Sequence, residues 1–157
     1  MSIDSPNGSG KTILVVDDNE IVIKTISLKL QGAGFKVLSA MDGTEAVSMV
    51  RKENPDLILL DLTFPPEVMG VPWDGFRIME WFGRLDAAKK IPIVVITGSE
   101  DPRIRERATL AGAVAFFQKP IDHDQLLKAI RETLTAKETL PAKVRAHLDT
   151  APEKWGF

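Results

Sequence analysis

The sequence of 157 residues predicts an α/β fold in which a doubly wound parallel sheet lies between two layers of helices. Short apolar runs typical of buried strands alternate along the chain with stretches that have the apolar spacing of helices. Four of the five runs lack polar alternation across their middle, as expected when helices cover both faces of a parallel sheet. Successive strand–helix units then imply right-handed crossovers.

The expected elements follow one another in strict strand–helix order. Strands are expected at Ile13 to Val16, Lys36 to Ser39, Leu57 to Leu62, Ile91 to Ile96 and Val114 to Gln118. Helices are expected at Glu20 to Gln31, Gly43 to Lys52, Gly75 to Leu85, Pro102 to Ala111 and Asp122 to Ala136. The second strand contains Lys36 and Ser39, so we expect it at an edge of the sheet.

Capping residues support these boundaries. Short polar side chains accept hydrogen bonds from the first free amides of a helix, and the candidates here are Asn19, Asp42, Asp101 and Asp122. Pro102 suits the first helical position, and Gly32 or Gly34 is expected to end the first helix.

The length favours one domain with two short flanking segments. Residues 1–12 are rich in Ser, Gly and Pro and are expected to form a mobile arm. Residues 13–136 are expected to form the domain, and residues 137–157 a C-terminal extension too short to build a second core. Leu140, Val144 and Leu148 recur at helical spacing, which favours a short amphipathic helix in the extension.

Composition excludes several kinds of chemistry. The net charge of -2 gives no broad positive field to hold nucleic acid or an anionic membrane. No apolar run approaches the roughly 20 residues that cross a bilayer, so we expect a cytoplasmic protein without direct membrane or nucleic-acid binding. The absence of Cys excludes disulfides and thiolate chemistry, which leaves carboxylates, hydroxyls and lysines.

Reactive side chains stand where the expected strands end. Asp17 and Asp18 follow the first strand, and Asp61 lies near the end of the third. Thr97 follows the fourth strand and Lys119 the fifth. Open α/β sheets bind ligands beyond the carboxyl ends of their strands, so these groups are expected to share one site.

The residue types at these strand ends suggest phosphoryl transfer. Crowded carboxylates repel one another unless a cation intervenes, and Mg²⁺ prefers such oxygen ligands. Asp18 and Asp61 could be direct ligands, with Asp17 acting through water. Lys119 and Thr97 would stabilise added negative charge on Asp61, which suggests formation and loss of an aspartyl phosphate.

The strand-end motifs resemble the receiver domain of two-component response regulators, the family that contains the bacterial chemotaxis response regulator. The motifs that carry this resemblance are Val15-Val16-Asp17-Asp18-Asn19, Leu59-Leu60-Asp61-Leu62, Val95-Ile96-Thr97-Gly98 and Phe116-Phe117-Gln118-Lys119-Pro120. The resemblance implies a flavodoxin-like five-stranded sheet in the order 2-1-3-4-5. It also implies a cis Lys119–Pro120 bond.

The resemblance also implies roles for single residues. Asp61 would accept a phosphoryl group, while Asp17, Asp18, Asp61 and the backbone carbonyl of Thr63 would serve Mg²⁺. Lys119 would pair with the phosphoryl group, and Thr97 and Phe116 would be the switch residues. Phe116 could instead be a core residue. Such a protein is a phosphoacceptor with only self-directed phosphotransfer and autodephosphorylation, not an enzyme acting on other substrates.

Partners follow from the same resemblance. The phosphoryl group would come from a histidine kinase or a histidine phosphotransfer protein. The face built from the fourth helix, fifth strand and fifth helix would meet a downstream protein or a second receiver in a homodimer. The expected fourth helix carries Arg103, Arg105 and Arg107, which favour a solvated face, with protein docking as the sharper alternative.

One segment departs from the family pattern. About six residues look inserted after Thr63, before the Asp74-Gly75 pair that members reach sooner. The loop that contains this insertion, residues 64–73, is apolar and rich in proline. They are expected either to shield Asp61 or contact a kinase or phosphatase, or to pack on their own sheet.

Two other functions share the fold class. A flavodoxin-like ligand-binding module would need a glycine-rich loop after the first strand, where Asp17-Asp18-Asn19-Glu20 stands instead. A Mg²⁺-dependent aspartyl-phosphate phosphatase of the haloacid dehalogenase type would need a second Asp two residues after the nucleophile, where this chain has Thr63.

Overall fold

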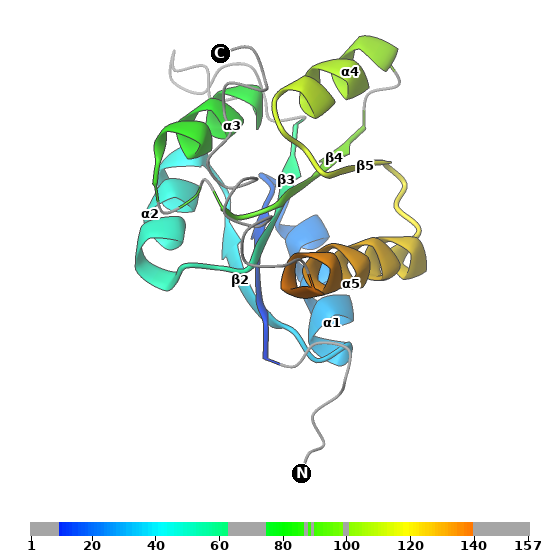
Figure 1. Ribbon diagram of the computed structural model, residues 1–157. Coiled ribbons are helices and arrows are strands. Elements are labelled where there is room, and N and C mark those ends of the chain that lie inside the picture. Colours follow the sequence, from blue (N-terminus) through cyan, green and yellow to red (C-terminus); the bar gives the residue numbers. More distant parts are fainter. Residues whose placement is uncertain (1–9, 63–74, 87, 89, 99–100, 140–157) are drawn as a thin grey trace.

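The computed structural model describes residues 10–62, 75–86, 88, 90–98 and 101–139. They form a five-stranded parallel sheet in the order β2-β1-β3-β4-β5 (Figure 1). The strands are β1 (Thr12–Val16), β2 (Lys36–Ala40), β3 (Leu57–Asp61), β4 (Ile93–Thr97) and β5 (Ala115–Gln118). The helices are α1 (Glu20–Gly32), α2 (Gly43–Glu53), α3 (Gly75–Arg84), α4 (Pro102–Leu110) and α5 (His123–Thr139). The predicted fold class and strand order are confirmed.

The ends of a few elements differ from the sequence-based expectation. Strand β1 begins at Thr12, inside the expected arm, because Thr12 pairs with Lys36 in the sheet. Strand β4 begins only at Ile93, because the Ile91 amide donates to the Ala88 carbonyl in the turn that precedes the strand. Helix α5 continues past the expected domain end to Thr139. Residues 1–9 of the expected arm and residues 140–157 of the expected extension lie outside the described residues.

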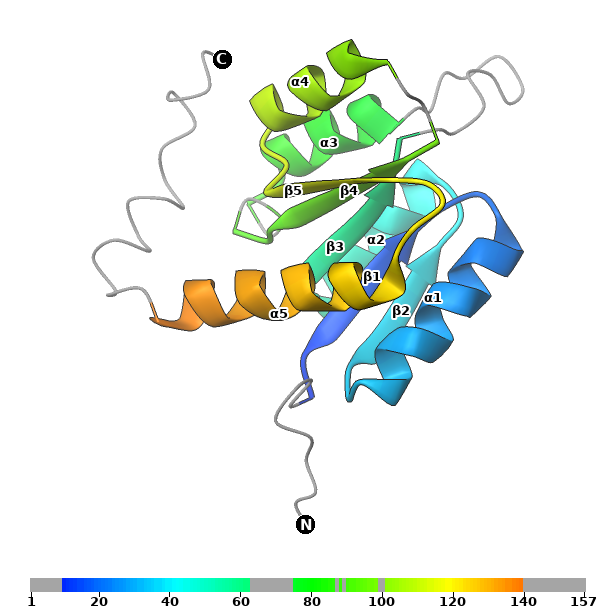
Figure 2. The same cartoon turned by 90° about the vertical axis from the view of Figure 1, so that its right-hand side faces the viewer.

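The helices cover the sheet on both faces and create two cores. Figure 2 shows α3 and α4 on one side of the sheet and α1 and α5 on the other. Alternate residues of one strand face opposite cores: Ile58 and Leu60 of β3 pack with the first helix group, while Leu57 and Leu59 pack with the second. Helix α2 joins the first group through Ala46 and Val50. This double cover explains why the apolar runs of the central strands lack polar alternation.

Strand β5 is the element whose packing the sequence predicts least well. Its residues Ala115, Phe116 and Phe117 are only half-buried, and Gln118 is exposed. The reason is that β5 lies at the edge of the sheet beside β4, whereas its apolar sequence is typical of a strand covered on both faces. Phe116 packs against one core and Phe117 against the other.

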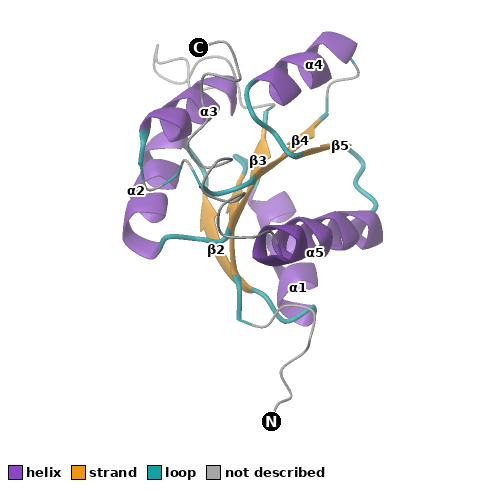
Figure 3. Cartoon of the chain, viewed as in Figure 1, coloured by secondary structure: helices purple, strands orange, loops and turns teal. Residues whose placement is uncertain are grey.

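Four helices begin at the caps that the sequence predicts. The Asn19 side chain accepts from the Ile21 and Val22 amides, and Asp101 accepts from the Arg103 amide. Asp122 accepts from the amides of residues 124 and 125. Asp42 accepts from the Glu45 amide, and the Glu45 carboxylate accepts in return from the Met41 amide. Each cap marks the residue at which a connection ends and its helix begins; Figure 3 shows these connections between strands and helices.

None of the helices in the described part of the chain is long and apolar enough to span a membrane.

Candidate functional site

The register of the parallel strands brings the predicted residues to one edge of the sheet. Val16 is aligned with Leu60, Asp61 with Ile96, and Thr97 with Gln118. The strand ends therefore lie level with one another, so Asp17, Asp61, Thr97 and Lys119 stand at one edge although up to 102 positions separate them. The Lys119 amide donates to the Thr97 carbonyl over 2.8 Å, which extends the pairing of β4 and β5 up to the site.

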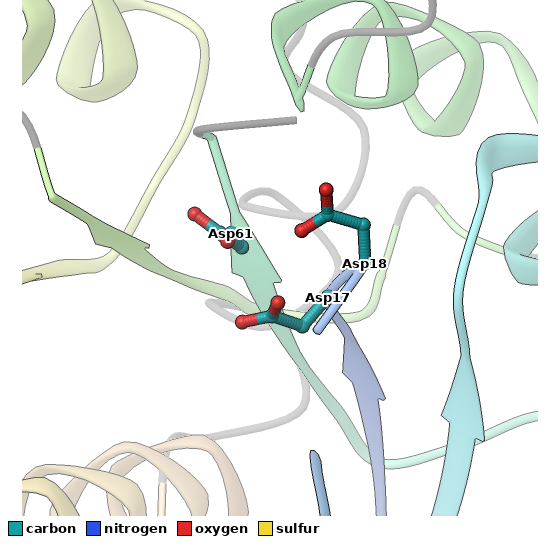
Figure 4. Close-up of side chains that lie close together, drawn as sticks. All are labelled: Asp17, Asp18 and Asp61. Carbon is teal, nitrogen blue, oxygen red and sulfur yellow. The ribbon is translucent and has the colours of Figure 1, made fainter. Parts of the chain in front are cut away.

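Three carboxylates converge at this edge. One oxygen from each of Asp17, Asp18 and Asp61 lies within 4.8 Å of the others, and Figure 4 shows the side chains together at the ends of β1 and β3. Asp17 and Asp61 are each only 2% exposed, whereas Asp18 is exposed. Two of the acids are thus held in the protein and the third faces solvent.

Lys119 bridges the two buried carboxylates. Its Nζ donates to Asp61 Oδ2 over 3.0 Å and to Asp17 Oδ2 over 3.4 Å. The Lys119–Pro120 peptide bond is cis, as the resemblance predicts. One ammonium group therefore lies against two carboxylates from different strands.

Asp17 is held from two sides, and its ionisation is disfavoured. Its Oδ1 accepts from the Asn19 amide over 2.8 Å, while Oδ2 faces Lys119. Burial raises the pKa of Asp17 to about 6, because desolvation and the nearby Asp61 charge outweigh the Asn19 hydrogen bond and Lys119. A second cation beside Asp17 would stabilise its ionised form.

Lys119 remains charged in this environment. Burial alone would lower the pKa of Lys119, but its hydrogen bond to Asp61 and the charges of both acids raise the pKa above its ordinary value. The ammonium group is therefore available to meet negative charge that develops at Asp61.

The chemistry of the donor set fits a hard divalent cation. Three carboxylates converge and Lys119 pairs with two of them, Asp17 and Asp61, so negative charge is in excess where the oxygen atoms meet. Mg²⁺ is bound through a few carboxylates plus water and phosphate oxygens, and this arrangement allows that. Asp17, Asp18 and Asp61 are the residues that could hold the ion.

The structure describes two of the three remaining predicted residues, Thr97 and Phe116, but not Thr63. Thr97 is fully buried at the end of β4, one residue beyond the partner of Asp61. Phe116 is half-buried in the middle of β5, aligned with Val95. Thr63, whose carbonyl was expected to serve the metal, lies outside the described residues, as does the inserted segment 64–73.

The structure adds contacts that the sequence does not reveal. The Arg105 guanidinium lies over the Phe116 ring at 5.5 Å from its centroid, and that of Arg107 lies 4.0 Å from the centroid of Phe76. All three arginines of the expected solvated face are exposed, but Arg105 and Arg107 also lie over aromatic rings of neighbouring elements. No spacing rule could indicate these pairs, because each ring belongs to a different element from its arginine. The hydrogen bond from the Asn19 amide to Asp17 is also not indicated by the sequence, which indicates only the capping role of the Asn19 side chain.

Known proteins share this fold and sequence pattern. Residues 13–131 match the family model of the response regulator receiver domain. The polar-differentiation response regulator DivK of Brucella anthropi is 28% identical over 124 residues, which cover 79% of this chain and 96% of the relative. A CheY-like response regulator receiver domain protein from Methanospirillum hungatei matches with a TM-score of 0.73 and 26% identity, over 83% of this chain and 98% of that one.

A further solved relative is the chemotaxis response regulator CheY4 of Vibrio cholerae, with a TM-score of 0.68 and 28% identity over 78% of this chain and 98% of that one. The fold, the acidic strand ends and these matches define a phosphoacceptor class of signalling domain. The chain belongs to the response regulator receiver domain family. These relatives give no support to a flavodoxin-like ligand-binding module or a phosphatase.

Proposed function

We propose that this receiver domain accepts a phosphoryl group on Asp61 and that the modification changes its protein–protein interactions. The observation that carries the proposal is the buried Asp61 carboxylate, 3.0 Å from Lys119 Nζ and within 4.8 Å of the acids at the end of β1. Phosphoryl transfer depends mainly on positioning and charge neutralisation, and this arrangement supplies both.

The proposed step uses groups of the described chain. An Asp61 carboxylate oxygen attacks the phosphorus of a phosphohistidine; the P–O bond forms, the P–N bond breaks, and the imidazole nitrogen leaves with the bonding electrons. Lys119 would then pair with the new phosphoryl oxygens. We assign Thr97 the role of a hydroxyl donor to the same group, supported by its place beside Asp61 on the neighbouring strand. Hydrolysis of the aspartyl phosphate at the same pocket would return the protein to its starting state.

Mg²⁺ is the cofactor that we propose for this pocket. When bound, it would neutralise charge on the phosphoryl oxygens and on the crowded acids. Asp17, Asp18 and Asp61 would hold it; the Thr63 carbonyl remains an expectation from the family resemblance. The raised pKa of Asp17 supports binding of such an ion, because the described pocket has a single ammonium group among three acids.

The proposed partners are a histidine kinase or a histidine phosphotransfer protein upstream, and a downstream protein or a second receiver at the face of α4, β5 and α5. Phe116 belongs to that face and would report the state of Asp61 to it. In this role the protein would act in the cytoplasm, where histidine kinases form phosphohistidine from ATP.

The test is phosphorylation of the full chain with acetyl phosphate and Mg²⁺, followed by intact mass spectrometry. We expect one added phosphoryl group in the wild-type protein and none in Asp61→Asn, which keeps the shape of the side chain but removes the nucleophilic carboxylate. Chelation of Mg²⁺ is expected to suppress the adduct in the wild-type protein.

Asp56→Asn is the matched control, because Asp56 lies at the opposite end of the sheet, where it accepts from the Thr12 amide. This variant should be phosphorylated like the wild type. No adduct on the wild-type protein, or an adduct that persists in Asp61→Asn, would overturn the proposal.

A further inference from the structure

Gly75, the first residue of α3, is unusually close to the backbone around Asp61. A Cβ atom built on Gly75 would lie 2.6 Å from Leu62 Cα, 2.8 Å from the Asp61 carbonyl oxygen and 2.5 Å from Leu62 Cδ2. Real Cβ atoms essentially never come within 3.0 Å of such neighbours. Two of the three atoms belong to the main chain, so rotation of a side chain cannot relieve the overlap.

Space alone, and not backbone conformation, requires glycine at this position. The glycines with positive φ in the described chain are Gly10, Gly34 and Gly112, and Gly75 is not among them. An alanine could therefore adopt the backbone angles of Gly75 without strain. The cost of any side chain there comes from the atoms of residues 61 and 62.

Neither side of this contact can move freely. The Leu62 amide donates to the Ile96 carbonyl over 2.9 Å, which ties the end of β3 to β4. On the other side, Ile78, Met79 and Phe82 anchor α3 in the core and are at most 4% exposed. A methyl group at Gly75 must therefore displace the end of β3, the start of α3, or both.

The displaced backbone carries the proposed phosphoacceptor. The Asp61 carboxylate meets Lys119 at 3.0 Å, and its register is set by pairing with Ile96. Misplacement of reacting groups by about 1 Å can cost on the order of 100-fold in rate. A shift at residues 61 and 62 is therefore transmitted to the distance between the nucleophile and its ammonium partner.

We propose that Gly75 is a positioning residue for Asp61: the missing side chain lets the first turn of α3 rest on the Asp61–Leu62 peptide and so holds the carboxylate in place. The inference rests on the proposed role of Asp61. It does not require Gly75 to touch the phosphoryl group or the metal.

The same helix supplies a matched control. Gly83 also lies in α3 but is exposed, and a Cβ atom there would meet nothing within 4 Å. Gly75→Ala and Gly83→Ala make the same chemical change in one helix, and only the first creates the overlap. Leu134→Ala in α5 is a second control, because it removes a buried side chain of the other core, away from the site.

The experiment measures three properties of the full chain for each variant: the rate of phosphorylation by acetyl phosphate with Mg²⁺, the urea midpoint, and metal-free amide NMR shifts. We expect Gly75→Ala to be phosphorylated about 10- to 100-fold more slowly under conditions where it is fully folded. The amide signals of Leu62 and Ile96 should move in this variant. Gly83→Ala should keep the wild-type rate and the wild-type signals of these two amides, and Leu134→Ala should keep the rate despite a lower urea midpoint.

Other outcomes overturn the inference. A folded Gly75→Ala protein with the wild-type rate, or a slow one whose Leu62 and Ile96 amides are unchanged, would show that Gly75 does not position Asp61. If Gly75→Ala does not fold, the Gly75→Ala/Gly83→Ala double variant is tested, and its failure to fold would make Gly75 a folding requirement instead. If the wild-type protein is not phosphorylated, the proposed function fails, while the metal-free amide shifts still decide whether Gly75 positions the end of β3.

Discussion

The centre of the sheet and its α4 edge deliver residues to the same pocket but are packed very differently. Every residue of β3 and β4 is buried. In contrast, three residues of β5 are half-buried and one is exposed, and Ala108 is the buried residue of α4. The acids at the ends of β1 and β3 thus stand on the best-packed strands, whereas Lys119 and Phe116 are carried by the least covered one.

This difference in packing implies that the two regions differ in how easily they are displaced. Elements with many buried apolar contacts open only at a cost near that of global unfolding, while sparsely covered elements rearrange more cheaply. The nucleophile of the proposed reaction is therefore held where displacement is most costly. Phe116, which is proposed to report the state of Asp61, lies on the half-buried β5, where displacement costs less.

The largest effect expected from this comparison is on stability. Ile58→Ala in β3 removes a side chain that is fully buried, and we expect it to lower the free energy of unfolding by about 2–5 kcal/mol. Val114→Ala, just before β5 and 54% exposed, should change it by less than about 0.5 kcal/mol. Urea unfolding of both variants measures the contrast. Similar losses in the two variants would remove the distinction between centre and edge.

A smaller effect is expected at the cap of α1, which adjoins the acidic pocket. Asn19→Ala removes the side-chain acceptor for the Ile21 and Val22 amides but keeps the Asn19 amide that donates to Asp17. We expect a loss of about 1 kcal/mol in the free energy of unfolding. Asn19→Ser, which restores an acceptor, should recover most of it in the same urea experiment. Equal losses for Ala and Ser would show that the cap does not stabilise this part of the chain.

The smallest effect is expected at the edge itself. The Arg105 guanidinium lies over the half-buried Phe116 ring, and such contacts at exposed sites contribute about 0.5–1 kcal/mol. A double-mutant cycle with Arg105→Gln and Phe116→Leu should give a coupling free energy near about 0.5 kcal/mol. The same cycle with Arg103→Gln should give none, because Arg103 pairs with Asp101. A coupling well above this value would mean that α4 holds β5 more firmly than its burial indicates.

The fold was predictable because its signals are local. The apolar run at the start of β3 (Leu57–Asp61) and caps such as Asn19 and Asp42 are recognised from neighbouring residues. The ends of elements were less predictable: Ile91 is apolar and buried like a strand residue, yet it belongs to the turn before β4. The half-burial of β5 also escaped prediction from its own residues, because Ala115, Phe116 and Phe117 form an apolar run like that of a central strand. Only the strand order implied by the family resemblance puts β5 at an edge of the sheet.

For the candidate site, the sequence indicated which residues gather but not how they are held. That Asp17, Asp61, Thr97 and Lys119 share an edge follows from the rule that parallel strands end together. The contact of Gly75 with the Asp61–Leu62 peptide and the stacking of Arg105 on Phe116 follow from no pattern in the chain. Each depends on how two elements pack against one another.

The sequence by itself determined the alternation of strands and helices and the reactive groups at the strand ends, because burial periodicity and capping act between near neighbours. Only the tertiary structure decided that Asp17 and Asp61 are buried around one ammonium group and that α3 begins directly on the peptide after Asp61. These features join residues far apart along the chain. Their distances are set by strand register and helix packing, which exist only once the whole domain has folded.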